Sequence, residues 1–300
     1  AFLASAHTGR SKVAVSNAIH PHTMQVLETY CWANSIEIVR LPIDDGLTNL
    51  AIDAADLACL IVQTPNFYGN IEDLAAMRKQ CDAAGCLMVV SANPVACALM
   101  KPPGEFGADI VVGEGQSLGV AMGFGGPLVG HLACKQEFVR KIPGRIVGRT
   151  VDANGTPGYT MTLRTREQDI RREKATSNIC TNEALMALAN TVYLAAMGKN
   201  GLRSVAESGV RNTAYAKEKL VKAGAKLKFP NAKNFDEFVI ELPKDAAAVH
   251  EKLVEKKIMA GLPLGRYCGG MNNCLLVAFT ESRTQQQIDR FAKELAPAIS

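Results

Sequence analysis

The stretch GADIVVGEGQSLG, residues 107–119, sets the expectation for the fold. It joins a short apolar run at residues 110–112 to a turn that is rich in glycine and polar residues. An apolar run without alternation is typical of a strand that is covered on both faces, as in a parallel sheet between helices. A second group of glycines, GFGGP at residues 123–127, allows close approach of the backbone just beyond this turn.

Similar apolar runs occur on both sides of this stretch, and they alternate with segments of helical period. The segments expected to form strands are residues 12–16, 36–41, 57–63, 86–91 and 128–134, and those expected to form helices are residues 22–34 and 71–85. Such alternation indicates βαβ units and a parallel sheet. Two further helices are expected at residues 181–198 and 202–223, and a smaller α+β pattern follows from about residue 225. We therefore expect a large α/β domain over residues 1–210 and a small C-terminal domain over residues 211–300.

The composition excludes several classes of protein. The formal net charge is +4 with dispersed charges, and no basic stripe with interleaved aromatic residues suggests nucleic-acid binding. No apolar stretch has the length of roughly 20 residues that a membrane-spanning helix needs. The nine cysteines are scattered, several of them inside apolar runs, which favours reduced thiols and a cytoplasmic protein. The chain starts at Ala1 in a segment that has a helical pattern, so we expect an N-terminal portion to be missing.

Polar residues follow three of the predicted strands. Asn66 lies in QTPNFYGN, Asn93 follows the strand at 86–91, and Glu114, Gln116 and Ser117 follow the strand at 110–112. Open parallel sheets bind ligands at the carboxyl ends of their strands. Each of these turns is also compatible with an ordinary connection. The five histidines have no metal-ligand spacing, so we expect no metal site.

Two segments in the middle of the chain have unusual compositions. Residues 140–160 are rich in Gly, Pro and Arg, include Arg145 and Arg149, and are expected to form a long functional loop. Thr176, Ser177 and Asn178 come just before the apolar helix that is expected to begin at Thr181. Their side chains either cap that helix or donate hydrogen bonds to a phosphate group at its N-terminus.

Taken together, several stretches resemble one family. They are QTPNFYG, ANPVA, GADIVVGEGQSLG, GFGGP, RKIPGRIVGRTVDANG and TREQDIRREKATSNICTNEAL, of which REKATSNICT is the most specific. The family is the P-protein of the glycine cleavage system, the decarboxylating glycine dehydrogenase, and the likeness is greatest to subunit 1 of the two-subunit bacterial form. It extends over residues 1–300. It implies the fold type I architecture of pyridoxal phosphate (PLP) enzymes, with a mixed, mostly parallel seven-stranded sheet between helices and a smaller α+β C-terminal domain.

The resemblance also implies that the chemistry of the site is missing from this chain. The position of the family's Schiff-base lysine corresponds to Ser117, and that of the neighbouring histidine corresponds to Gln116. The acidic residue that holds the pyridine nitrogen is expected near the end of the strand at 86–91, where Ser91, Ala92 and Asn93 stand. PLP catalysis needs an amine for the imine and an anion beside the pyridinium. We therefore expect a degenerate pocket with no catalytic residue, lined by Asn66, Asn93, Glu114, Gln116 and Ser117.

By the same resemblance, the chain acts in a hetero-oligomer. PLP and the lysine are expected on subunit 2, and the assembled enzyme decarboxylates glycine and transfers the aminomethyl group to the lipoyl H-protein. Thr176, Ser177, Asn178, Arg145 and Arg149 are the candidates to contribute to the partner's site. Alternatives are an independent PLP enzyme that uses Lys101 or Lys135, a catalytically silent scaffold or regulatory subunit that serves as a docking platform for H-protein, and a truncated fragment without function.

Overall fold

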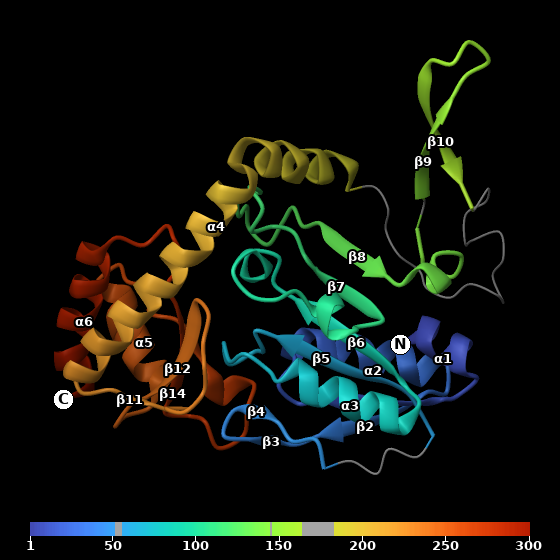
Figure 1. Cartoon of the computed structure of the whole chain (residues 1–300). Helices are drawn as coiled ribbons and strands as arrows, with labels where there is room; N and C mark the ends of the chain where they lie inside the picture. Colours follow the sequence, from blue (N-terminus) through green and yellow to red (C-terminus); the bar gives the residue numbers. More distant parts are fainter. Residues whose placement is uncertain (52–55, 145, 164–182) are drawn as a thin grey trace.

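The computed structural model describes residues 1–51, 56–144, 146–163 and 183–300 of the chain. Its larger part is built on a sheet with the strand order β2–β1–β5–β6–β7–β8 (Figure 1). These strands are Lys12–Ser16 (β1), Glu37–Leu41 (β2), Leu57–Thr64 (β5), Leu87–Ala92 (β6), Ile110–Glu114 (β7) and Gly130–Cys134 (β8). The first five run parallel to one another and β8 runs antiparallel to β7. The expected mixed, mostly parallel sheet is therefore confirmed.

The number of strands in this sheet differs from the expectation of seven. Over the described residues the sheet has six strands, and β8 forms one of its edges. The reason is that no described segment pairs with the outer edge of β8, whose inner edge is occupied by β7.

The two faces of the sheet are covered by different helices. Alternate side chains point to opposite faces of a strand. On one face, Val13, Val15 and Ile61 pack with the helices Phe2–Thr8 (α1) and Pro21–Ala33 (α2). The residues that pack toward the helix Leu74–Ala84 (α3) on the other face include Ala14, Leu60, Val62, Met77, Cys81, Met88 and Val90. This double covering explains why the central strands β5 and β6 are apolar along most of their length.

Local signals fix both ends of α3. The side chain of Asp73 accepts hydrogen bonds from the backbone N–H groups of Ala75 and Ala76, at 3.1 and 3.0 Å. Gly85 ends the helix in the left-handed region, with φ of 57°. Both residues are of the types that favour these positions, so the predicted helix is confirmed.

A second, antiparallel sheet lies in the C-terminal part, with the order β11–β12–β14–β13. Its strands are Lys226–Leu227 (β11), Glu237–Glu241 (β12), Leu262–Pro263 (β13) and Cys274–Ala278 (β14). The helices Ala246–Glu255 (α5) and Gln285–Ile299 (α6) share its core. The buried side chains at the centre of this core include Leu220, Phe238, Ile240, Leu253, Leu275 and Leu295. The α+β pattern expected from residue 225 onward is confirmed.

The helix Ala184–Lys222 (α4) connects the two parts (Figure 1). Its backbone leaves the helical conformation at Gly198, with φ of 60° and ψ of −175°, which is where the first of two expected helices was to end. The start expected at Thr181 lies outside the described residues. The boundary between residues 210 and 211 falls inside α4, so the proposed domain limits stay a prediction.

The segment expected to be a long loop is instead a β-hairpin. Ile146–Val151 (β9) pairs antiparallel with Pro157–Thr162 (β10), and Figure 1 shows the hairpin projecting from the body of the molecule. The turn is held by Asp152, whose carboxylate accepts hydrogen bonds from the N–H groups of Asn154 and Thr156, and by Gly155 at φ of 81°. The expectation of an irregular loop at residues 140–160 was wrong because DANG is a turn signal between two strands.

The remaining elements are short. They are the strand pair Ile43–Asp44 (β3) and Leu47–Thr48 (β4), and the 3₁₀ helices Ala96–Ala98 (η1), Pro103–Phe106 (η2), Gln136–Phe138 (η3) and Leu264–Arg266 (η5). Within the described ranges, no helix combines the length and the apolar character that crossing a membrane requires.

Candidate functional site

The three predicted polar turns come together at the carboxyl edge of the large sheet. Gln63 pairs in register with Ser91, and Ser91 pairs with Val112, so β5, β6 and β7 end side by side. Because these strands are parallel, the turns that follow them lie at the same edge. The turns after β5, β6 and β7 therefore lie at one edge of the sheet, but of the five predicted pocket residues only Glu114 lines the cavity described below.

The turn after β5 is closed by its own hydrogen bonds. Asn66 is 1% exposed, and its amide donates to the carbonyl of Gly46 at 2.9 Å and to Oε1 of Glu72 at 2.8 Å. Its Oδ1 accepts from the N–H groups of Tyr68 at 3.0 Å and Asn70 at 3.1 Å. These four bonds use both donors and both acceptor positions of the amide. Asn66 thus holds the turn together and has no hydrogen-bonding capacity left for a ligand.

Glu72 is the buried acid of this network. Its carboxylate also accepts bonds from the N–H and the hydroxyl of Thr48. Burial raises the pKa of Glu72, although the hydrogen bonds from Asn66 and Thr48 act in the opposite direction. A carboxylate with this many donors stabilises the turn and is not available for proton transfer in an open pocket.

Asn93 has a local structural role after β6. Its Oδ1 accepts hydrogen bonds from the N–H groups of Val95 at 2.9 Å and Ala96 at 3.4 Å, which fixes the turn between β6 and η1. The side chain is half-buried. The Oδ1 atom is used within this turn, and the uncharged amide supplies no negative charge at the end of β6.

The loop after β7 is anchored to β8 and to α4. Glu114 Oε1 accepts from the N–H of Gln116 at 3.0 Å and from the N–H of Val129 at 2.9 Å. The side chain of Asn190, on α4, donates to the carbonyls of Gly115 and Leu118 at 3.0 and 2.8 Å. These bonds hold a conformation in which Ser117 is exposed and no described residue bonds to its hydroxyl.

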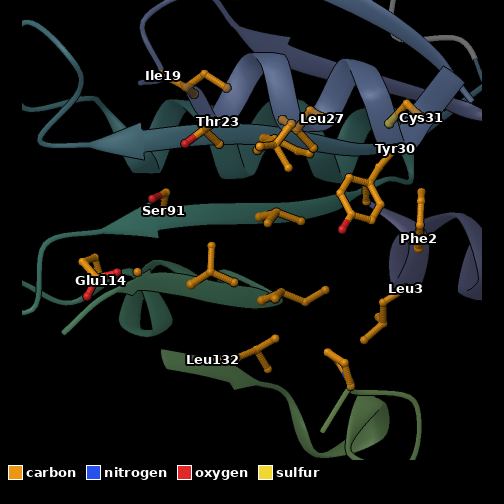
Figure 2. Close-up of a pocket in the computed structure, with 18 residues that line it drawn as sticks. Phe2, Leu3, Ile19, Thr23, Leu27, Tyr30, Cys31, Ser91, Glu114 and Leu132 are labelled. Atoms are coloured by element: carbon orange, nitrogen blue, oxygen red, sulfur yellow. The ribbon is translucent and has the colours of Figure 1, made fainter. Parts of the chain in front are cut away.

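An apolar cavity of about 560 Å³ opens beside these turns, over the sheet face that α1 and α2 cover in part. Figure 2 shows Ser91 and Glu114 at one end of the cavity and Phe2 and Tyr30 at the other. Among the described residues that line it, Tyr30, Ser91, Glu114 and Thr23 are those whose side chains carry a hydroxyl or a charge. None of the described residues that line the cavity is Lys, Arg or His.

The two lysines considered as alternative nucleophiles do not line this cavity. Lys135 forms an ion pair with Asp109, which comes just before β7. Because β8 runs antiparallel to β7, Lys135 at the end of β8 lies beside the start of β7, at the edge of the sheet opposite to the cavity's polar end. Lys101 is exposed, with its ammonium group 4.6 Å from the centre of the Phe106 ring. Without an amine or an acid at the end of β6, the residues at this edge do not fit PLP as a covalently bound cofactor.

The candidate residues for a partner's site are only partly described. Thr176, Ser177, Asn178 and Arg145 lie outside the described residues. Arg149 lies on β9, where its side chain is exposed on the projecting hairpin. The structure does not bring Arg149 into the cavity at the sheet edge.

A second cavity, of about 270 Å³, is lined by an acid that the sequence did not single out. It lies between the two parts of the molecule and is lined by His20, Gln63, Phe67 and Glu237, among others. Burial, with a smaller contribution from the charge of Asp236, raises the pKa of Glu237 to about 7. No described residue donates a hydrogen bond to the carboxylate of Glu237. Glu237 was not predicted because it lies in β12, far from Gln63 in sequence, and only the fold brings the two residues to one cavity.

The comparison with known proteins agrees with this geometry. Residues 1–295 match the family described as glycine cleavage system P-protein. A protein of Anoxybacillus flavithermus named probable glycine dehydrogenase (decarboxylating) subunit 1 is 46% identical over 299 residues, covering 98% of this chain and 66% of its own length. A protein of the same name from Geotalea uraniireducens is 45% identical, covering 100% of this chain and 69% of its own length.

Solved structures give the same result. The crystal structure of glycine decarboxylase (P-protein) of the glycine cleavage system, in inhibitor-bound form, superimposes with a TM-score of 0.92 at 40% identity, over 99% of this chain and 68% of that chain. A sphingosine-1-phosphate lyase from Burkholderia pseudomallei shares the fold, with a TM-score of 0.69 at 16% identity. The fold class implied by the resemblance is thereby confirmed. The chain spans about two thirds of the length of the curated relatives that it matches.

Proposed function

The chain belongs to the glycine cleavage system P-protein family, and from this premise we propose that it is the subunit of a glycine dehydrogenase (decarboxylating) that carries no Schiff-base lysine. In this proposal PLP and the lysine belong to a sister subunit. The assembled enzyme decarboxylates glycine and passes the aminomethyl group to the lipoyl arm of H-protein. The names of the curated relatives, which designate them as subunit 1, support the existence of such a partner.

One observation carries the proposal. At the edge where a fold of this kind places its cofactor, the chain has Ser117 and Gln116 in an exposed loop and Ser91 at the end of β6, and no cationic side chain lines the adjacent cavity in the described ranges. The scaffold is kept while the groups that perform the chemistry are absent. A chain of this type contributes to the reaction by assembling with a chain that has them.

The chain's own residues have structural and positioning roles in this proposal. Glu114 and Asn190 hold the loop after β7, and Asn66 holds the turn after β5, so that the carboxyl edge keeps one shape. Thr176, Ser177, Asn178 and Arg145 are proposed to contact anionic groups in the sister subunit's pocket. Arg149, which is exposed on the hairpin, is likewise proposed to face the sister subunit. A cytoplasmic location is in keeping with the eight free cysteines among the described residues.

Cofactor labelling tests the proposal directly. The protein is incubated with PLP, alone and together with its lysine-bearing sister subunit, then reduced with borohydride and mapped by peptide mass spectrometry. We expect no label on this chain, a label on one lysine of the sister subunit, and release of CO₂ from glycine only in the mixture, because an imine requires an amine in the pocket.

Two variants control for the alternative of an independent enzyme. Lys101→Arg and Lys135→Arg keep the positive charge but remove the primary amines nearest to the site in the sequence, and both are expected to leave the labelling pattern unchanged. A reducible adduct on a lysine of this chain, lost in one of these variants, would contradict the proposal and identify the nucleophile.

A further inference from the structure

The hairpin formed by β9 and β10 is largely uncovered by the rest of the described chain. Its two strands pack against each other, and their main contacts are with each other (Figure 1). A two-stranded hairpin without further packing is marginally stable in water. Its conformation therefore needs support from a surface outside the described chain.

The two faces of the hairpin differ in chemistry. One face is formed by the cross-strand pairs Val147–Met161, Arg149–Tyr159 and Val151–Pro157. The exposed fractions on this face are 60% for Val147 and Val151, 75% for Tyr159 and 53% for Met161. The opposite face carries Ile146, Gly148, Thr150, Gly158, Thr160 and Thr162, of which Ile146 is half-buried. Hence the exposed large apolar side chains of the hairpin are on one side, and we call Val147, Arg149, Val151, Tyr159 and Met161 the docking face.

The charge of Arg149 determines which kind of surface can cover the docking face. It occupies the middle pair of the three, between Val147 and Val151, and it forms no ion pair with any residue that the structure describes. Covering it with a purely apolar surface would bury an unpaired charge, which is strongly unfavourable. A complementary surface is therefore apolar and presents a carboxylate opposite Arg149.

A second copy of this chain is a poor occupant of the docking face. A two-fold contact of the face with itself brings like residues together around its centre. The centre is the Arg149–Tyr159 pair, so two guanidinium groups would meet in an apolar contact. Like charges that meet in such an interface oppose association.

We propose that the docking face binds the lysine-bearing sister subunit, through an apolar patch that carries a carboxylate for Arg149. This inference rests on the proposed function, which requires a second chain to supply the lysine that is absent from the described lining of the cavity. The hairpin projects away from the two sheets of its own chain, where another chain can contact it (Figure 1). Its exposed apolar side chains are on the docking face, which such a contact would bury.

The test compares the two faces of the same hairpin. Val147→Asp and Met161→Asp place a charge on the docking face, whereas Thr150→Asp and Thr160→Asp place the same charge on the same two strands but on the opposite face. The affinity for the purified sister subunit is measured by biolayer interferometry and by sedimentation velocity. We expect about 100-fold weaker binding for the variants on the docking face, because a charge that is desolvated at the centre of an interface is costly. For the variants on the opposite face we expect binding to weaken less than about 3-fold, because a charge outside the centre of the interface stays hydrated.

Arg149→Met tests the carboxylate on the partner's side. This variant keeps a long side chain without the charge. We expect about 10-fold weaker binding and a flatter dependence of the affinity on salt concentration than for the unchanged protein, since a lost charge pair no longer responds to screening.

The outcomes separate the docking face from the proposed function. If the unchanged protein binds the sister subunit and all four aspartate variants bind equally well, the docking face is overturned and the proposed function stands. If the unchanged protein forms no complex at all, both are overturned. If the protein self-associates without the sister subunit, and Val147→Asp abolishes that association, the occupant is a second copy and the inference is overturned.

Discussion

The turn at residues 65–72 and the hairpin at residues 146–162 are both connections that follow strands, yet they are built in opposite ways. In the turn, Asn66 and Glu72 are buried, and their polar atoms are hydrogen-bonded within the chain. In the hairpin, Tyr159 and Met161 are exposed, and Arg149 has no ion-pair partner in the described chain. The turn can be understood from this chain alone, whereas the hairpin cannot.

This difference shows that the turn stabilises the fold of the chain, whereas the hairpin is suited to contact another surface. A buried polar network is stabilising only when every group in it is satisfied, so the turn is sensitive to any single change. An uncovered apolar face contributes little to the stability of the isolated chain, because its burial has not yet taken place. Substitutions in the two regions should therefore have different effects on unfolding.

The largest effect is expected for Asn66→Ala. The variant loses the bonds to Gly46 and Glu72 and leaves the N–H groups of Tyr68 and Asn70 without an acceptor in a buried site. Leaving several buried polar groups unsatisfied costs about 3 kcal/mol or more. Urea denaturation followed by circular dichroism measures this loss.

The matched control is Asn154→Ala, in the turn of the hairpin. The Asn154 side chain is exposed and makes no hydrogen bond within the described chain, since only its backbone N–H donates to Asp152. We expect its free energy of unfolding to change by less than about 0.5 kcal/mol. Equal losses in the two asparagine variants would remove the distinction between the two regions.

A smaller effect, which depends on pH, is expected for Glu237→Gln beside the turn. An added Cβ at Gly69 would lie 2.1 Å from the carbonyl oxygen of Glu237, so the turn and β12 are in tight contact there. Burial raises the pKa of Glu237 to about 7 in the folded chain, above its value of about 4.3 in an unfolded chain. The folded state therefore holds this proton more strongly, and wild-type stability falls as pH rises from about 4.3 to 7.

Glutamine cannot ionise, so Glu237→Gln should be more stable than wild type at pH 8, by about 1–3 kcal/mol, and should lose this advantage below pH 4. Burial also raises the pKa of Asp236, to about 6. The stability of the variant therefore still depends on pH in part, through Asp236. Thermal unfolding from pH 4 to 8 measures the difference. Glu255→Gln, on an exposed position of α5, should retain the wild-type slope, and an identical slope in both variants would argue against a buried Glu237 carboxyl.

The fold was largely predictable from the sequence. The strands Lys12–Ser16 and Leu57–Thr64 were found within one residue of their ends, because strands covered on both faces are apolar throughout. The hairpin was missed for the opposite reason. The alternation of Val147, Arg149 and Val151 has a charge in its middle, and its apolar side is not buried by any described part of this chain, so it did not resemble a strand of a core.

Of the candidate site, the sequence predicted the edge of the sheet at which the polar turns lie. The resemblance puts Ser117 at the position of the family's lysine; the structure places Ser117 in the exposed loop after β7, and the correspondence to the lysine stays a prediction. The role of Asn66 was not predictable, because its partners Gly46 and Glu72 come from different segments that only the fold brings together. Polar residues at a strand end thus indicated a site, while the hydrogen-bond network decided which of them remain free.

The smallest effect is expected for Gly155→Ala in the hairpin, and the same substitution at Gly69 provides its comparison. Both glycines have positive φ, of 81° and 80°. An added Cβ at Gly155 has no heavy atom within 4 Å, whereas at Gly69 it would collide with the backbone of Glu237. The strain at Gly155 is about 1 kcal/mol and falls on a hairpin that can open by itself, so the global free energy of unfolding should change by less than about 0.5 kcal/mol.

Hydrogen exchange shows where that strain acts. In Gly155→Ala, the amides of β9 and β10 should exchange on the order of five-fold faster, while those of β5 and β6 keep the wild-type rate, because a local opening does not require the sheet to unfold. In Gly69→Ala, the amides of β5 and of β12 should both exchange faster. The added Cβ would collide with the backbone of Glu237 in β12, so the strain acts on both sheets. If Gly155→Ala accelerated exchange in β5 as well, the hairpin would be part of the cooperative core, and a surface outside the chain would no longer be needed to explain its conformation.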